Sequence, residues 1–351
     1  MQYIKFHKKN GISYTVDENH ILVMKLKNVE LIYWCDKRQR YKVRYMQNLK
    51  VTDAIFSYKK TKISKIASED DKILLFNNAT MFLVNKRNEP GYNKLNDIIK
   101  ISVKDYLSLP TYCRIYIYGL RQEINYLEKH VDLDPYMLGL WLGDGTTTEP
   151  AITNIDDVII NYIYQYTDNN NLRITVKSDI TYYLAGNNRR NIFLTYLRQY
   201  NLLGNKHIPL DYMLNTREIR LQVLAGLLDT DGYYDIKGNC YEITQKSDVL
   251  AIDIQTLAHS LGFKTFYKKI NKYCTYKGKR VDGVYNTIYI YGNCIYNIPC
   301  KTIRKQARRD GKDINHCLNK ITITKEPDNL ITNIEIENDS DYFGIDYTVL
   351  H

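Results

Sequence analysis

The stretch LAGLLDTDG, Leu224 to Gly232, has a second copy upstream in MLGLWLGDG, Met137 to Gly145. Both copies are mostly apolar, carry small residues four positions apart, and end on Asp-Gly. Positions four apart share one face of an α-helix, so each copy predicts a short helix with small residues along one face. Two such helices can pack with their backbones close together, as small-xxx-small pairs do.

Each predicted helix ends at an aspartate followed by glycine, the usual helix terminator. Side-by-side packing would bring Asp144 and Asp231 together, and two adjacent carboxylates repel unless a cation lies between them. Mg²⁺ prefers oxygen ligands, including those of phosphate. We predict that both aspartates bind Mg²⁺, that Mn²⁺ can replace it, and that the carbonyls of Gly143 and Thr230 complete part of the coordination. Such a metal suits attack of water on a phosphodiester.

Two other interpretations of these motifs exist. A single copy is equally well explained as an ordinary buried helix that ends at a glycine, but two copies favour a duplicated functional unit. A calcium loop starting at Asp229 would use Asp231 and Asp235. It fails because the glycine needed at loop position six falls at position four, and position twelve holds no glutamate.

Both copies match the LAGLIDADG signature, and the chain resembles the two-motif LAGLIDADG homing endonucleases. The resemblance implies an α+β fold in which an αββαββα unit is repeated as a pseudo-dimer, here across residues 131–315. It implies a monomer with internal pseudo-two-fold symmetry that binds double-stranded DNA. Its activity would be that of an endodeoxyribonuclease, making a metal-dependent double-strand break at a long, specific site.

The same resemblance identifies lysine candidates. LAGLIDADG inteins carry a Lys-x-Ile-Pro block, and Lys206 in GNKHIP matches it, which implies an active-site lysine that orients water or stabilises the phosphorane charge. A phosphate contact or a solvated surface lysine is the alternative. A symmetric partner is expected in NIPCKTIRKQARR, where spacing does not separate Lys301 from Lys305, although Lys305 is preferred.

The strands after each copy are expected to bind DNA as two-stranded ribbons, which fit the major groove. Most of these contacts would go to phosphates. Each basic residue taken alone is better explained as a solvated charge, but their clustering over 264–280 with interleaved tyrosines favours that stretch. The candidate DNA contacts are Lys177, Arg189, Arg190, Lys237, Lys246, Lys268, Lys269, Lys272, Lys277, Lys279 and Arg280.

The flanking segments resemble an intein, the Hint splicing fold, of DNA-polymerase type. TVDENHILV, Thr15 to Val23, places His20 where the intein histidine polarises the N-terminal scissile amide. In the C-terminal run, Asp341 takes a place often held by His or Asp, and His351 that of the histidine that assists cyclisation of a terminal Asn. A buried histidine beside a strand and an ordinary chain terminus are the alternatives.

The flanks also depart from the intein pattern. No Asn follows His351, and nineteen residues precede His20. We therefore expect either an excerpt of a longer intein-bearing protein or a free-standing derivative, with splicing dependent on residues missing from this chain. The expected organisation is an all-β Hint-like domain, residues 1–130 and 316–351, into which the endonuclease of residues 131–315 is inserted. A DNA polymerase is the expected host.

Composition agrees with a polyanionic partner, because 49 Lys and Arg outweigh 39 Asp and Glu, giving a formal charge of +10. Seven cysteines without a CxxC pair argue against a disulfide framework and a zinc site, so a reducing, intracellular location is expected. No apolar run is long enough to predict a membrane span. The alternative functions are an RNA maturase and a protein-splicing element with an inactive endonuclease.

Short β-like runs outside the central region predict strands. They are Ile21–Met24, Lys42–Tyr45, Ile73–Phe76, Arg114–Tyr118, Ile331–Glu337 and Tyr347–Leu350.

Overall fold

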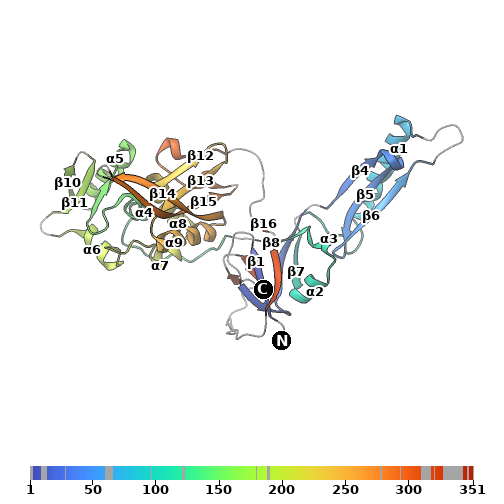
Figure 1. Cartoon of the computed structure of the whole chain (residues 1–351), viewed down its shortest axis with the longest axis horizontal. Helices are drawn as coiled ribbons and strands as arrows, with labels where there is room; N and C mark the ends of the chain where they lie inside the picture. The colour runs from blue at the N-terminus through green and yellow to red at the C-terminus, as the bar shows by residue number, and fades with distance from the viewer. Residues whose placement is uncertain are drawn as a thin grey trace. The chain divides into compact units, whose positions relative to one another are not determined.

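A computed structural model gives the coordinates of the chain. It describes residues 3–8, 14–27, 29–59, 66–95, 97–120, 123–178, 180–187, 190–276, 279–292, 294–309, 318–319, 321–326, 343–345 and 348–350. The chain forms two compact units, one of residues 122–317 and one of residues 1–121 together with 318–351 (Figure 1).

The unit of residues 122–317 is built around two helices, α4 (Pro135–Asp144) and α8 (Arg217–Asp231). Both end at the aspartate that the sequence predicts. Asp134 begins α4, since its side chain accepts a hydrogen bond from Met137 N at 2.8 Å, and Pro135 at the first position suits a helix start. Residues 136 to 142 of α4 are all buried, so the middle of this helix lies inside the unit.

The two helices pack as closely as the small residues predict. A Cβ added at Gly139 would lie 2.3 Å from Val223 O and 2.9 Å from Gly226 Cα. The expected role of the terminal glycines needs correction, because Gly145 and Gly232 have φ values of −72° and −84°, outside the left-handed region. Glycine is needed there for space, since a Cβ at Gly145 would lie 2.2 Å from Trp141 O.

Each of these two helices is followed by strand, then by a helix and then by an antiparallel pair of strands, although one strand precedes the next helix after α4 and two strands precede it after α8. After α4 come β9 (Ala151–Thr153), α5 (Asp157–Asn169), β10 (Leu172–Ser178), β11 (Thr181–Gly186) and α6 (Ile192–Gln199). After α7 (Leu210–Met213) and α8 come β12 (Gly232–Asp235), β13 (Cys240–Gln245), α9 (Asp248–Ser260), β14 (Lys264–Tyr276) and β15 (Lys279–Tyr291). Two antiparallel sheets result, ordered β10-β11-β9 and β12-β13-β15-β14. Two short 3₁₀ turns, Ile295–Asn297 and Ile303–Lys305, complete the unit.

The other unit joins segments from both ends of the chain. Strand β1 (Tyr3–Lys8) pairs with β2 (Tyr14–Asp17) on one side and with β17 (Ile321–Glu326) on the other. A second sheet has the order β16-β8-β3-β19-β18, with β7 also paired to β3. Its strands are β3 (Ile21–Leu26), β7 (Ile98–Ser102), β8 (Ile117–Leu120), β16 (Leu318–Asn319), β18 (Phe343–Ile345) and β19 (Thr348–Leu350).

A third sheet in this unit is a meander of β4 (Leu31–Cys35), β5 (Arg40–Gln47) and β6 (Lys50–Ser57). Helix α1 (Glu69–Lys86) packs on one of its faces around Val43, Tyr45 and Ala79, as the side-by-side ribbons in Figure 1 show. Two short helices, α2 (Val103–Ser108) and α3 (Thr111–Arg114), lie further along the chain.

The sequence interpretation of this unit was partly wrong. Ile73–Phe76 lies inside α1 and is not a strand, because Ser68 and Asp71 form a capping box that starts a helix just before it. Arg114 ends α3, so the strand expected at Arg114–Tyr118 begins only at Ile117. The unit is not all-β, since it contains α1, α2 and α3. The strands expected at Ile21–Met24 and Lys42–Tyr45 are confirmed within β3 and β5.

Ile331–Glu337 lies outside the described residues, and Thr348–Leu350 of the last predicted run forms β19. Among the described helices, none is long and apolar enough to cross a membrane. The cysteines whose side chains the structure describes are free thiols, at positions 35, 113, 240, 294 and 300.

Candidate active site

Asp144 and Asp231 end α4 and α8 at the place where the two helices meet. A Cβ built on Gly143 would lie 3.4 Å from Asp231 Oδ2 and 1.9 Å from Thr230 Oγ1. Burial, and then the nearby charge of Asp231, raise the pKa of Asp144 to about 6. Burial also raises the pKa of Asp231. The structure therefore holds two carboxylates in an environment that disfavours their negative charge.

Each carboxylate accepts a hydrogen bond from a side-chain amide on the strand region that follows its helix. Asn154 Nδ2 donates to Asp144 Oδ2 at 2.7 Å, and Gln245 Nε2 donates to Asp231 Oδ2 at 2.6 Å. Asn154 is fixed in turn, because its Oδ1 accepts from Asp156 N at 2.8 Å. Sequence reasoning missed both amides, although each lies at or just beyond the end of a strand after an Asp-Gly.

Two lysines contact the C-terminal carbonyl groups of the same helices. Lys206 Nζ donates to Gly143 O at 3.1 Å and to Gly145 O at 2.7 Å. Lys305 Nζ donates to the carbonyl oxygens at the end of α8, at 3.1, 2.7 and 2.8 Å, which belong to Leu228, Asp229 and Thr230. The helix dipole favours a cation at a helix C-terminus. The C-terminal ends of α4 and α8 each have one ammonium group in an equivalent place.

The contacts separate the two lysines that the sequence left open. Lys305 is 5% exposed and reaches the end of α8. The Nζ of Lys301 lies over the rings of Tyr136 and Tyr162, 4.9 and 4.7 Å from their centres. Lys305 is therefore the positional counterpart of Lys206.

Burial affects the two ammonium groups as well. Desolvation lowers the pKa of Lys206 to about 8, against the opposing attraction of Asp231 and Asp144. Desolvation, followed by the charge of Arg304, lowers the pKa of Lys305. Both groups thus lie in the field of the carboxylates while losing part of their hydration.

The donor set fits a hard divalent cation in part. Desolvation raises the pKa values of both carboxylates, a cation between them would relieve this, and carboxylate oxygens suit Mg²⁺. The carbonyls of Gly143 and Thr230, predicted as further ligands, each accept a hydrogen bond from a lysine in this structure. The described residues contain no cluster of three or more His, Cys, Asp or Glu side chains, so remaining ligands would be water or phosphate oxygens.

Asp229 has a different role. It is buried, and its carboxylate accepts from Tyr136 Oη at 2.6 Å, from Lys301 N at 2.6 Å and from Thr302 N at 3.2 Å. These bonds attach the segment that carries Lys305 to α8.

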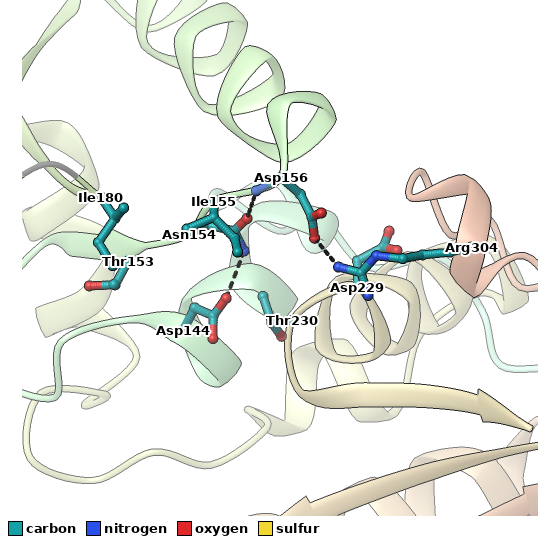
Figure 2. Close-up of a pocket in the computed structure, with 9 residues that line it drawn as sticks. All are labelled: Asp144, Thr153, Asn154, Ile155, Asp156, Ile180, Asp229, Thr230 and Arg304. Atoms are coloured by element: carbon teal, nitrogen blue, oxygen red, sulfur yellow. Dashed lines mark hydrogen bonds and ion pairs between the residues drawn. The ribbon is translucent and has the colours of Figure 1, made fainter.

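A pocket of about 220 Å³ opens beside Asp144 and is lined by residues that follow α4 and by Asp229 and Thr230 of α8. Figure 2 shows Asp144 and Asn154 on one side and Thr230 with Asp229 on the other. An ion pair of 2.6 Å between Arg304 Nη2 and Asp156 Oδ2 links the second half to the start of α5.

The sheet registers divide the predicted DNA contacts between two faces. Lys268 and Lys272 of β14 both lie on the sheet face opposite α9. Lys272 Nζ donates to Thr244 Oγ1 at 3.2 Å. Lys269 lies on the face that α9 covers, where its Nζ contacts both carboxylate oxygens of Asp248. Period-two alternation in a strand explains why neighbouring lysines separate.

The other basic candidates have mixed surroundings. Lys177 on β10 pairs with Glu149 at 2.5 Å and lies 4.6 Å from the centre of the Tyr183 ring. Arg280 on β15 pairs with Asp282 at 2.8 Å. Arg190, Lys237 and Lys246 are exposed. Arg189 and Lys277 lie outside the described residues, and the structure describes only the backbone of Lys279.

The intein-like residues lie in the other unit or outside the described residues. His20 directly precedes β3, and its carbonyl accepts from Val103 N at 3.0 Å. Asp341 and His351 fall outside the residues that the structure describes. Their predicted roles remain predictions.

Comparisons with known proteins find similarity in the central unit. Residues 218–298 match the family described as LAGLIDADG-like domain. A replicative DNA helicase DnaB of Mycobacterium intracellulare is 31% identical over 181 residues, which are 50% of this chain and 26% of that protein. The chain thus spans about a quarter of the length of this curated relative.

The similar solved structures are of the homing endonuclease I-DmoI. One, from work on its mesophilic variants, is 18% identical, with a TM-score of 0.29, and the match covers 45% of this chain and 87% of that one. Two others are variants in complex with their target DNA, one in the presence of manganese and one of magnesium. Both are 17% identical with TM-scores of 0.30, covering 45% of this chain and 86% and 88% of theirs.

Proposed function

We propose that the chain is a site-specific homing endonuclease that makes a metal-dependent double-strand break in DNA. The observation that carries the proposal is the paired arrangement of Asp144 and Asp231. They end two closely packed helices, and each has an amide donor and a lysine beside it. A LAGLIDADG-like domain at residues 218–298 supports the same function.

The proposed chemistry is hydrolysis of one phosphodiester in each DNA strand. Asp144 and Asp231 would hold Mg²⁺, for which Mn²⁺ can substitute, and the metal would supply Lewis-acid stabilisation and activation of water. Asn154 and Gln245 fix the orientation of the two carboxylates. Lys206 and Lys305 place one positive charge in each half, where it would stabilise negative charge that develops on a phosphate.

The remaining parts of the proposal concern the assembly. We propose a monomer in which residues 131–315 act as a pseudo-dimer with one active site per DNA strand, and an intracellular location. Support for the pseudo-dimer comes from the strand, helix and strand pair that follow both α4 and α8, although the number of strands before the second helix differs. The open sheet faces with Lys268 and Lys272 would contact duplex DNA mainly through phosphates.

We further propose that the endonuclease is inserted in an intein-like Hint domain. Support comes from the pairing of β1 with β17, because these strands come from opposite sides of the endonuclease in the sequence. In this proposal the host protein is a DNA polymerase, because the flanking segments resemble inteins of DNA-polymerase type. The similarity to a helicase does not imply ATP hydrolysis here, because the sequence contains no Gly-x₄-Gly-Lys-Ser/Thr motif.

An RNA maturase and a splicing element with an inactive endonuclease are the alternative functions. The paired site disfavours both, since neither needs two preserved carboxylates with lysines beside them. A maturase would bind intron RNA more tightly than duplex DNA, and a splicing element would require a nucleophile and a terminal Asn supplied by neighbouring sequence.

The test is cleavage of a genomic duplex DNA library by the purified chain, with Mg²⁺ and with EDTA. We expect cutting at one long site with Mg²⁺, none with EDTA, and none by Asp144→Asn or Asp231→Asn, while both variants still bind the site. Asp235→Asn, which neutralises a carboxylate on β12 near Asp231 in sequence, is the matched control and should cut normally. Continued cutting by the Asp144→Asn, Asp231→Asn double variant would overturn the metal assignment.

A further inference from the structure

Helix α1 covers one face of the meander of β4, β5 and β6. The opposite face is covered at the Met46 end of β5, where Met46 is buried in a cluster with Val103 and Tyr106, and the cations of β5 precede Met46 on the same strand. Cross-strand partners share a face, so the register assigns the residues. Tyr41, Val43 and Tyr45 of β5 point toward α1, where they belong to the same hydrophobic cluster as Ala79. The alternate residues Arg40, Lys42 and Arg44 therefore occupy the opposite face. We call this face the β5 basic face.

Three cations on one central strand give this face its charge. Arg40 is opposite Cys35 and Ser57, and Lys42 is opposite Tyr33 and Ile55. Two of the cations share one carboxylate, since Asp53 Oδ2 lies 2.5 Å from Lys42 Nζ and Asp53 Oδ1 lies 2.9 Å from Arg44 Nε. The face thus keeps a net positive charge.

Apolar side chains flank the cations on the two outer strands. Leu31, Tyr33 and Ile55 are 49%, 37% and 50% exposed, and they share the face with the basic stripe. Exposed apolar side chains gathered beside charges indicate a binding surface. Basic residues beside apolar ones match the phosphates and thymine methyl groups of a DNA groove.

The dimensions of the face fit the major groove of B-form DNA. Neighbouring strands lie about 4.8 Å apart, so three strands span about 10 Å, against a groove about 12 Å wide. Arg40 and Arg44 are four residues apart, which places them about 13 Å apart along the strand. Sheets that present strands to a groove are an established way of binding DNA.

We propose that the β5 basic face is a second duplex-DNA-binding surface, in addition to the cleavage site. It lies in the unit of residues 1–121 and 318–351, so it does not share residues with the site at Asp144 and Asp231. Its affinity would come from phosphate contacts by Arg40, Lys42 and Arg44. The proposal goes beyond the proposed function and does not require that the chain cuts DNA.

The test measures binding of the full chain, in EDTA, to a mixed-sequence DNA duplex about three helical turns long. The test variant carries Arg40→Gln, Lys42→Gln and Arg44→Gln. The matched control removes three exposed lysines from other elements of the same unit, by Lys94→Gln, Lys100→Gln and Lys104→Gln. Far-ultraviolet circular dichroism and thermal unfolding check that both variants remain folded.

We expect the test variant to bind about tenfold more weakly at low salt, and its plot of log K against log salt to be shallower by about 2.7, because three phosphate contacts are lost. The control should keep the wild-type slope. Asp53→Asn should act in the opposite direction and tighten binding, because it removes the one carboxylate that Lys42 and Arg44 share.

Two results would overturn the proposal. One is a test variant with the affinity and salt slope of the wild type. The other is equal weakening of binding to an A-form RNA duplex, whose major groove is too narrow to admit a sheet and which would show non-specific charge attraction. Either result is independent of the cleavage test, since no cutting is measured here.

Discussion

Gly139 and Gly226 lie opposite each other where α4 crosses α8. A Cβ on Gly226 would come within 2.4 Å of Tyr136 O and 2.7 Å of Leu140 N, both backbone atoms. Backbone cannot move aside as a side chain can, so these two glycines set the distance between the helices. That distance in turn determines how closely Asp144 and Asp231 approach.

The first prediction concerns this contact. Gly226→Ala should lower the free energy of unfolding by roughly 3 kcal/mol, because the helices must separate to admit a methyl group. Chemical denaturation followed by circular dichroism measures the loss. Gly283→Ala on β15 is the control, since a Cβ there meets the ring of Tyr285, which can move. Equal stability of the two variants would contradict the proposed role of the helix contact.

The second prediction concerns Arg220, which is fully buried at the start of α8. Its guanidinium donates to Asn215 O at 2.8 Å, Ser260 O at 2.6 Å and Ile124 O at 2.5 Å. Arg220→Met would leave these buried carbonyls without their donor and should cost about 3 kcal/mol or more of unfolding free energy.

A matched control lies one turn earlier on the same helix. Arg217 is about a quarter exposed and pairs with Glu123 at 3.1 Å, so Arg217→Met should cost less than about 1 kcal/mol. Thermal and urea unfolding of both variants would check the contrast. Similar losses for the two would show that the network around Arg220 does not carry the stability assigned to it.

The third prediction follows from the presence of one lysine at the end of α4 and one at the end of α8. Lys206→Met and Lys305→Met should each slow cleavage of one DNA strand more than the other, so that nicked DNA accumulates. A supercoiled plasmid carrying the target site would show this as open-circular product. Lys301→Met is the control, because its Nζ lies over two tyrosine rings and not on the end of α8. Nicking by the Lys301 variant, with normal cutting by the Lys305 variant, would reverse the assignment.

The fourth prediction uses the pKa of Asp144, which burial and the charge of Asp231 raise to about 6. A carboxyl whose pKa is higher in the folded state than its unfolded value of about 3.9 binds protons more tightly when folded. The stability of the metal-free protein should therefore fall as the pH rises from about 4 to 6, through this group, and then level off.

Asp144→Asn should remove that part of the pH dependence. In EDTA at pH 8 the variant should be more stable than the wild type by about 1 kcal/mol, after allowance for solvent screening. The comparison needs unfolding curves at several pH values, with Asp235→Asn as control. A variant less stable than the wild type at pH 8 would show that the ionised Asp144 carboxylate does not destabilise the folded protein.

Local patterns in the sequence predicted much of the central fold. The apolar runs with small residues four apart predicted α4 and α8, and Asp-Gly predicted where each ends, because helix periodicity and termination depend on neighbouring residues. The same kind of reasoning failed at Ile73–Phe76, where four apolar residues fit a strand or a helix. The capping box at Ser68 resolves that choice toward the helix.

The identities of Lys206 and the two aspartates came from short motifs, but Asn154 and Gln245 have no motif around them. An amide becomes part of the site only when a strand brings it within hydrogen-bond distance of a carboxylate, which depends on where β9 and β13 lie relative to the ends of α4 and α8. The choice of Lys305 over Lys301 likewise depends on which side chain points to α8.

The sequence by itself determined the two helices, their terminal aspartates and the surplus of positive charge, since these depend on residue type and on spacing within a few turns. The tertiary structure decided which lysine and which amides join the aspartates, and that Lys268 and Lys269 lie on opposite faces of their sheet. It also decided that Arg40, Lys42 and Arg44 line one face. These features depend on strand register and on contacts between segments far apart in the chain, which no local pattern records.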